Sequence, residues 1–177
     1  MKIVYAILIV IAALIALVLI IALFVKKEYT VEREVTINKP VPEVFDYVSR
    51  IKKQVEFNVW VQADPNLKQE FIGTDGTVGF INKWNGNKKA GEGEQEITGL
   101  VPNERLDMAL RFKRPMESKA TAYFITKEAG NNSTVVTWGM NGRSPYPMNF
   151  MNLFIDSMLG MDMETSLNNL KNNIEKQ

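Results

Sequence analysis

The sequence contains no cysteine and no histidine among its 177 residues. These absences exclude disulfides, thiolate nucleophiles, imidazole general bases and the commonest zinc ligands. Any catalysis would have to use carboxylate, lysine, arginine, tyrosine or hydroxyl groups. We therefore predict no metal site and no cofactor.

The chain also lacks an excess of positive charge. It has 21 Lys and Arg against 20 Asp and Glu, and Lys2 is the one charged residue before Lys26. The remainder therefore carries 20 basic and 20 acidic side chains and is formally neutral. Proteins that bind nucleic acid normally show a strong basic excess, so we predict no nucleic-acid partner. The length gives one domain of ordinary size.

One long hydrophobic run is present. Residues 3–25 form 23 positions without a charge, and a helix of that length spans the hydrocarbon core of a bilayer. A cleaved signal peptide is the rival interpretation, but its apolar region is normally about 7 to 15 residues long. We expect a transmembrane anchor at 1–27 and a single domain at 28–177. Lysines after the run favour a cytoplasmic domain.

The pattern after residue 28 changes to short strands. Residues 29–37 alternate apolar and polar side chains, and 42–51 show helical spacing after two prolines. Residues 52–66 are irregular. Turn residues at regular intervals then predict six more antiparallel strands and a terminal helix, at 67–73, 78–84, 90–100, 105–112, 119–127, 133–142 and 149–176.

The stretch "NGNKKAGEGEQEITG" at 85–99 could be read as a phosphate-binding loop. Such a loop needs a helix after its glycines, whereas Gly91 and Gly93 are followed by a strand pattern with nearby glutamates. Asn85-Gly86 is instead a hairpin signal. The two glycines share one face of a strand, and they indicate either a bend or a ligand close to the backbone.

In each predicted strand, the side chains at one set of alternate positions are mainly apolar. Together they predict a concave inner face of the sheet. The sequence places Val78 on it beside larger side chains, and the terminal helix is expected to cover it with Phe150, Met151, Phe154, Met158 and Met161. Ordinary core packing explains the same pattern, but two inward amides need partners, water or a ligand. The candidate ligand-binding residues are Phe80, Asn82, Trp84, Gln95, Met108, Phe124, Trp138, Met140, Phe154 and Met158.

Two longer stretches carry a family resemblance. The run "FNVWVQADPNLKQEFIGTDGTVGFINKWNGNKKAGEGEQEITGLVPNERLDMALRF" and the terminal "YPMNFMNLFIDSMLGMDMETSLNNLKN" resemble the polyketide cyclase/dehydrase-like bacterial group of the SRPBCC (START-like, Bet v 1-like) superfamily. The resemblance covers about 29–175. It implies an α+β helix-grip fold, in which a seven-stranded curved antiparallel sheet wraps around a long C-terminal helix. Members bind apolar molecules, and some catalyse reactions in the cavity.

Three functions remain open from the sequence. The first is a membrane-anchored module that binds a hydrophobic small molecule or lipid between sheet and helix. The second is a cyclase- or dehydratase-like enzyme with Asn82 and Gln95, and either Tyr47 or Tyr123, orienting its substrate; no catalytic residue is assigned. The third is a membrane-associated protein-interaction module without a ligand. Four acidic residues occupy the strand positions that alternate with the apolar ones and are expected to face solvent, namely Glu92, Glu94, Glu96 and Asp107.

Overall fold

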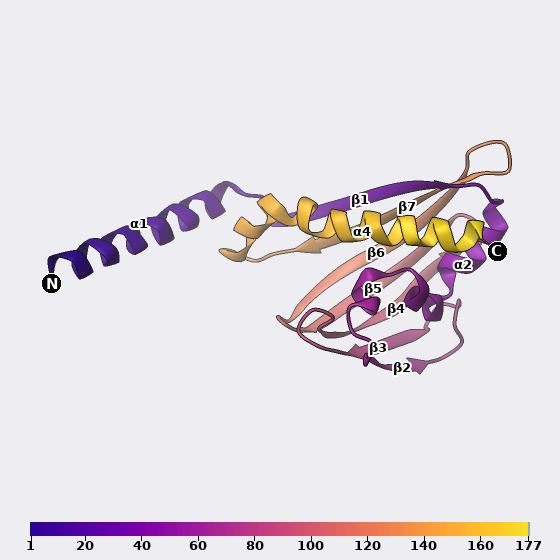
Figure 1. Ribbon diagram of the computed structural model, residues 1–177, viewed down its shortest axis with the longest axis horizontal. Coiled ribbons are helices and arrows are strands. Elements are labelled where there is room, and N and C mark those ends of the chain that lie inside the picture. The colour runs from indigo at the N-terminus through magenta and orange to yellow at the C-terminus, as the bar shows by residue number, and fades with distance from the viewer. Residues whose placement is uncertain (177) are drawn as a thin grey trace.

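The structure, a computed structural model, describes residues 1–176 and is shown in Figure 1. Its helices are α1 (Lys2–Phe24), α2 (Val41–Ser49), the 3-10 helix η1 (Ile51–Glu56), α3 (Val59–Gln62), the 3-10 helix η2 (Met148–Met151) and α4 (Asn152–Glu175). Its strands are β1 (Glu28–Ile37), β2 (Lys68–Ile72), β3 (Ile81–Asn85), β4 (Glu92–Val101), β5 (Arg105–Arg114), β6 (Ser118–Glu128) and β7 (Thr134–Arg143).

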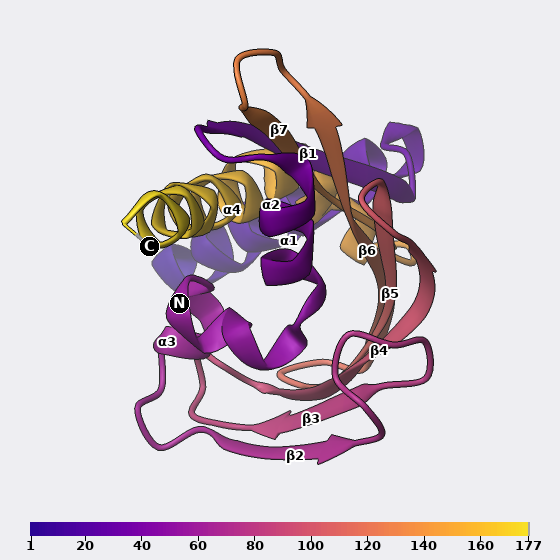
Figure 2. The ribbon, with the colours of Figure 1, turned by 90° about the vertical axis from the view of Figure 1, so that its right-hand side faces the viewer.

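The seven strands form one antiparallel sheet. Their order is β1-β7-β6-β5-β4-β3-β2, so every neighbour is consecutive in the chain except β1, which pairs with β7. Figure 2 shows the sheet curving around the helices, with α2, α3 and α4 on its concave side. The predicted α+β architecture, a curved seven-stranded sheet with a long C-terminal helix, is confirmed.

The strand register shows which loops share an end of the sheet. At one end of the sheet, the residues paired across neighbouring strands are Glu28 and Arg143, Gly142 and Ala120, Phe112 and Ser118, Arg114 and Glu92, and Glu92 and Asn85. The loops 86–91 and 115–117 therefore lie at the end where α1 joins β1, as Figure 1 shows. We call this the α1 end of the sheet.

One face of α4 packs into the core along the helix, and the side chains on the opposite face of its first half are exposed. Met163 and Leu167 lie four residues apart, on one face of the helix, and are buried against the sheet. Phe154, Met158 and Met161 were expected to cover the concave face, but they are 48, 52 and 65% exposed. These three side chains lie on the side of α4 opposite to Ile155, Leu159 and Met163, which pack against the core.

The Asn85-Gly86 pair does not form a two-residue turn. Strands β3 and β4 pair only as far as Asn85 and Glu92, so residues 86–91 form a longer loop. Gly91 has φ +69°, and a Cβ atom there would lie 2.6 Å from the carbonyl oxygen of Arg114. A Cβ atom on Gly93 would lie 2.7 Å from the ring of Trp84. These glycines therefore allow close approach by parts of the chain itself.

Two other details differ from the predicted pattern. Val78 is 59% exposed, because β3 begins only at Ile81 and Val78 lies in the preceding turn. Residues 52–66, predicted as irregular, contain most of η1 and all of α3.

The N-terminal helix α1 projects away from the sheet (Figure 1). Among residues 1–176 it is the one helix that is long and apolar enough to cross a membrane by length and composition. Only its last turns contact the rest of the chain, where Ala22 is buried. A signal sequence near the N-terminus can meet the same criterion, so this finding alone leaves both interpretations open.

Candidate functional site

A pocket of about 240 Å³ lies between the concave face of the sheet and residues 54–61. Its floor consists of inward-facing residues at alternate strand positions, because side chains two apart share one face of a strand. The floor residues are Asn82, Trp84, Gln95, Met108, Leu110, Phe112, Ala122, Trp138 and Met140. Most of the lining is therefore apolar, with amides at one side.

Residues 54–61 form the roof of the pocket. The Asn58 side chain caps α3 by accepting a hydrogen bond from the backbone N–H of Trp60 at 3.0 Å. The Trp60 indole donates to Oδ2 of Asp162 on α4 at 2.8 Å. The backbone N–H of Val59 donates to Oγ of Ser166 at 3.1 Å. These bonds hold the short helix α3 between α4 and the sheet.

Amide side chains form two hydrogen-bonded pairs in the pocket. Gln95 Nε2 donates to Oε1 of Gln54 at 2.9 Å, and Gln69 Nε2 donates to Oδ1 of Asn82 at 3.3 Å. The inward amides predicted from sequence are therefore partnered by the chain. Each pair still has donor and acceptor capacity for a ligand.

Trp138 differs from the amides on the floor because its polar atom has no partner among the residues that the structure describes. Its ring is 3% exposed and stacks on Phe124, with centroids 5.1 Å apart. Within residues 1–176, its buried Nε1–H has no hydrogen-bond partner. Because most buried donors in proteins are satisfied, this group is a candidate donor to an oxygen atom of a ligand.

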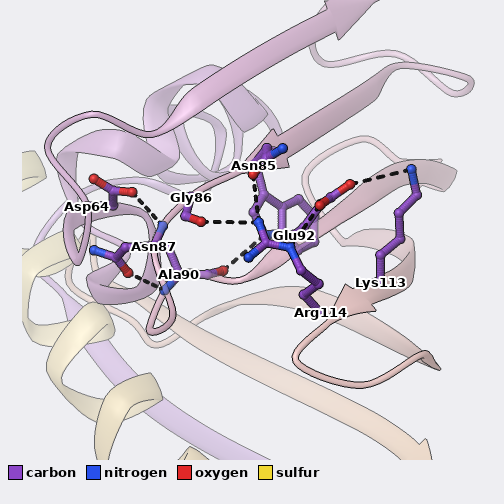
Figure 3. Close-up of polar contacts among 9 residues, drawn as sticks. Asp64, Asn85, Gly86, Asn87, Ala90, Glu92, Lys113 and Arg114 are labelled. Carbon is purple, nitrogen blue, oxygen red and sulfur yellow. Dashed lines mark hydrogen bonds and ion pairs between the residues drawn. The ribbon is translucent and has the colours of Figure 1, made fainter.

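The mouth of the pocket lies at the α1 end of the sheet, where the exposed residues Lys89 and Arg114 line it. Arg114 Nε donates to Oε2 of Glu92 at 2.9 Å, and Nη2 donates to Oδ1 of Asn85 at 2.7 Å and to the carbonyl of Gly86 at 3.2 Å. Figure 3 shows these bonds tying the end of β5 to the loop 86–91.

The other side of that loop is also fixed. The backbone N–H of Asn87 donates to Oδ2 of Asp64 at 2.6 Å, and the Asn87 amide nitrogen donates to the carbonyl of Ala63 at 3.0 Å. Asn87 Oδ1 accepts from the backbone N–H of Lys89. It also accepts from the backbone N–H of Ala90, as Figure 3 shows. The loop 86–91 is therefore a structured rim of the pocket.

The structure brings together six of the ten predicted ligand-binding residues. Asn82, Trp84, Gln95, Met108, Trp138 and Met140 all line the pocket. Phe80 and Phe124 are fully buried in the core beside it, and Phe154 and Met158 are exposed on α4 outside it. That the ten candidate residues contact a ligand stays a prediction.

The roof and rim were missed by sequence reasoning. Trp60 and Gln54 lie in a segment whose irregular pattern did not predict which side chains face the core. Leu159 is the residue through which α4 lines the pocket. The tryptophan in "FNVWVQ" was the available signal, because a large aromatic side chain in an irregular segment commonly packs onto a neighbouring core.

The tyrosines considered for the enzyme alternative lie outside the pocket lining. Tyr47 donates to Glu56, and burial together with that carboxylate raises the pKa of Tyr47. Tyr123 donates to Glu32, and burial, followed by this bond, raises the pKa of Tyr123 to about 12. Glu94 and Glu96 pair with Arg111 rather than facing the pocket. No cluster of acidic residues that could hold a metal ion occurs in the described part of the chain.

Residues 28–175 match the sequence profile of the family described as "Polyketide cyclase / dehydrase and lipid transport". The chain belongs to this family. The match confirms the resemblance seen in the sequence and covers the whole sheet and all of α4, but not α1. No curated protein matches the chain in sequence.

Solved structures share the fold of this member of the polyketide cyclase/dehydrase and lipid transport family. Norcoclaurine synthase from Thalictrum flavum has a TM-score of 0.66 at 10% identity, covering 85% of this chain and 95% of that one. A protein from Thermobifida fusca has a TM-score of 0.60 at 14% identity, covering 83% of this chain and 93% of that one. The Aha1 dimer from Colwellia psychrerythraea has a TM-score of 0.55 at 16% identity, covering 83% of this chain and 96% of that one. At these identities the likeness extends to the fold alone.

Proposed function

We propose that the chain is a membrane-anchored module that binds a hydrophobic small molecule or lipid in the pocket between the sheet and residues 54–61. The observation that carries this proposal is the pocket itself. It is lined mainly by apolar side chains, it has a structured rim, and it contains a buried indole N–H without a partner in residues 1–176. Apolar walls with a few placed polar groups are typical of small-molecule sites.

The volume of the pocket limits the size of its ligand. About 240 Å³ lies just below the usual range of roughly 300–1,000 Å³ for small-molecule sites. The space suits one acyl chain or a small ring system. A lipid with two chains would have to leave one of them outside the pocket.

Contacts at the end of α1 support an uncleaved anchor at 1–27. Asn149 donates to the carbonyls of Ala22 and Val25, and Asn152 donates to the carbonyls of Lys26 and Lys27. The domain therefore uses the last turns of α1 as a packing partner, which a cleaved signal would remove. The cytoplasmic placement of residues 28–177 stays a prediction, and protease access in sealed vesicles tests it.

The enzyme alternative has less support. Lys89 and Arg114 are the titratable side chains that line the pocket within residues 1–176, and both lie at its rim. Arg114 is already bonded to the rim loop. A general acid or base must reach the reacting atom, so a reaction deep in the pocket would rely on the amides and Trp138 to orient the substrate.

A pair of equal substitutions on opposite faces of the sheet tests the binding proposal. Ala122 lines the pocket. Ala109 on the neighbouring strand lies on the other face of the sheet and is partly exposed. In Ala122→Phe the added ring fills the pocket at a cost of about 1–3 kcal/mol in stability. In Ala109→Phe the ring points out of the pocket.

The measurement is native mass spectrometry of the full chain released from lipid nanodiscs. We expect copurified apolar ligand on the wild type and on Ala109→Phe, and little on Ala122→Phe. Circular dichroism checks that both variants are folded. An empty wild-type chain, or equal ligand on both variants, would contradict the proposal.

A further inference from the structure

A stretch without charge connects the sheet to α4 at the α1 end. Between Arg143 and Asp156 the sequence reads "SPYPMNFMNLFI", and we call these residues 144–155 the juxta-anchor segment. Several of its large apolar side chains are exposed rather than packed, namely Tyr146, Met148, Met151, Leu153 and Phe154, at 41–55%. Contiguous exposed apolar side chains of this kind mark an interaction surface.

The juxta-anchor segment is bonded to the last turns of α1. The hydroxyl of Tyr146 donates to the carbonyl of Leu19 at 3.5 Å. Asn149 Nδ2 donates to the carbonyls of Ala22 at 2.6 Å and Val25 at 2.8 Å. Ala22 is 1% exposed as a result of this packing. The segment therefore moves with the end of α1.

These contacts fix the depth of the segment relative to α1. The apolar run at 3–25 is about 35 Å long as a helix, against a hydrocarbon core of about 30 Å. Leu19 and Ala22 lie about 9 and 5 Å before Val25 along the helix axis. If α1 crosses the bilayer, side chains that touch Leu19 and Ala22 lie at the boundary between hydrocarbon and headgroups.

We propose that the juxta-anchor segment is a second membrane contact, with Met148, Met151, Leu153 and Phe154 inserted into the interfacial layer beside the end of α1. This inference rests on the proposed anchor. The flanking charges fit the same partner, because Lys26, Lys27 and Arg143 lie at the polar edge of the segment and suit anionic headgroups. Tyr146 lies at the depth where tyrosine is enriched in membrane proteins.

The second contact has a consequence for the pocket. A single helix anchor allows a domain to tilt, whereas two adjacent contacts restrict its orientation. The rim loop 86–91 and the loop 115–117, which contains the exposed Met116, lie at the same end of the sheet as the segment. The mouth is therefore held on the membrane-facing side, where an apolar ligand exchanges with the bilayer over a short path.

Single cysteine substitutions test the inference, since the natural chain contains no cysteine. Full-length Met151→Cys and Phe154→Cys are spin-labelled in liposomes containing phosphatidylcholine and phosphatidylglycerol. Collision rates are measured with oxygen, which concentrates in lipid, and with a water-soluble nickel chelate. Val101→Cys is the matched control, because Val101 is an exposed apolar residue at the other end of the sheet. Leu14→Cys reports on the middle of α1.

We expect the ratio of oxygen to nickel collisions at 151 and 154 to be several-fold higher than at 101 and to approach that at 14. A lipid-like ratio at 14 with a water-like ratio at 151 and 154 would overturn the second contact and leave the anchor intact. A water-like ratio at 14 would overturn both. A label at 151 or 154 that is shielded from both reagents, with a spectrum broadened by the same label on a second copy, would show contact between copies of the chain and would overturn the second membrane contact.

Discussion

Trp60 of α3 meets Trp138 of β7 edge to face, with ring centroids 5.5 Å apart and an interplanar angle of 70°. Through its indole N–H, Trp60 is also bonded to Asp162 of α4. One side chain thus joins the roof of the pocket, its floor and the C-terminal helix. The proposed binding function depends on this junction, because the sheet and the second half of α4 alone leave the pocket uncovered.

Replacing Trp60 should open the pocket. Trp60→Ala removes both the edge-to-face contact and the bond to Asp162, and we expect ligand retention to be lost. The destabilisation should fall below the 3–5 kcal/mol typical of a fully buried tryptophan, because Trp60 is partly exposed. Trp60→Phe keeps an aromatic contact and should retain part of the ligand. Native mass spectrometry and denaturant unfolding measure the two effects, and equal retention in both variants would contradict the assigned role.

The unpartnered indole of Trp138 predicts a ligand with an acceptor oxygen. Trp138→Phe should lower ligand occupancy, and its cost in stability in the ligand-free chain should come from the smaller ring alone, because no intrachain bond of Nε1 is lost within residues 1–176. Trp84→Phe is the matched control, because Trp84 Nε1 donates to the carbonyl of Ala90 at 3.1 Å. That variant should loosen the rim loop instead. A purely hydrocarbon ligand, or unchanged occupancy in Trp138→Phe, would argue against a hydrogen bond to the indole.

The bonds of Arg114 predict a role in the rate of ligand exchange. Arg114→Ala frees the loop 86–91 from β5, so a bound fluorescent fatty acid should leave the protein faster without a large change in fold. Arg50→Ala is the control, because Arg50 pairs with Asp46 at the surface and does not line the pocket. Stopped-flow transfer to acceptor vesicles measures both rates. An identical rate in the two variants would mean that the loop does not limit exchange.

Tyr123 predicts a loss of stability at high pH. Burial, followed by the bond to Glu32, raises its pKa to about 12 in the folded chain, against about 10 when unfolded. Folding therefore favours the neutral phenol, and the resulting stability is complete below pH 10 and is lost as the pH rises towards 12. Tyr123→Phe should remove this part of the pH dependence. Thermal unfolding across that range checks the prediction, and parallel curves for the two proteins would refute it.

Most of the fold could be predicted because strand parity and turn residues repeat at regular spacing. The alternation in β5, where Leu106, Met108 and Leu110 are buried, placed the floor of the pocket correctly. The buried stripe of Met163 and Leu167 in α4 followed from helical spacing in the same way. Both patterns arise from local geometry, so they are visible in the sequence.

The roof and the orientation of the first half of α4 were not predicted from the sequence. The segment around Trp60 has no period, and its position is set by bonds to Ser166 and Asp162, more than a hundred residues away. Phe154 and Met158 were assigned to the pocket because they are apolar and lie on the helix that grips the sheet. The first half of α4 is apolar on nearly every side, so its composition did not show that Ile155 and Leu159 would face the core while Phe154 and Met158 would not.

The most direct test of the account is the position at which an apolar probe binds. A fatty acid with a diazirine at the end of its chain is added to the full chain in nanodiscs, activated by light, and located by peptide mass spectrometry. The account predicts adducts on pocket-lining residues such as Met108, Leu110 and Met140, which excess unlabelled fatty acid removes. Adducts confined to α1 and the juxta-anchor segment would show that the chain only contacts the bilayer, and would contradict binding in the pocket.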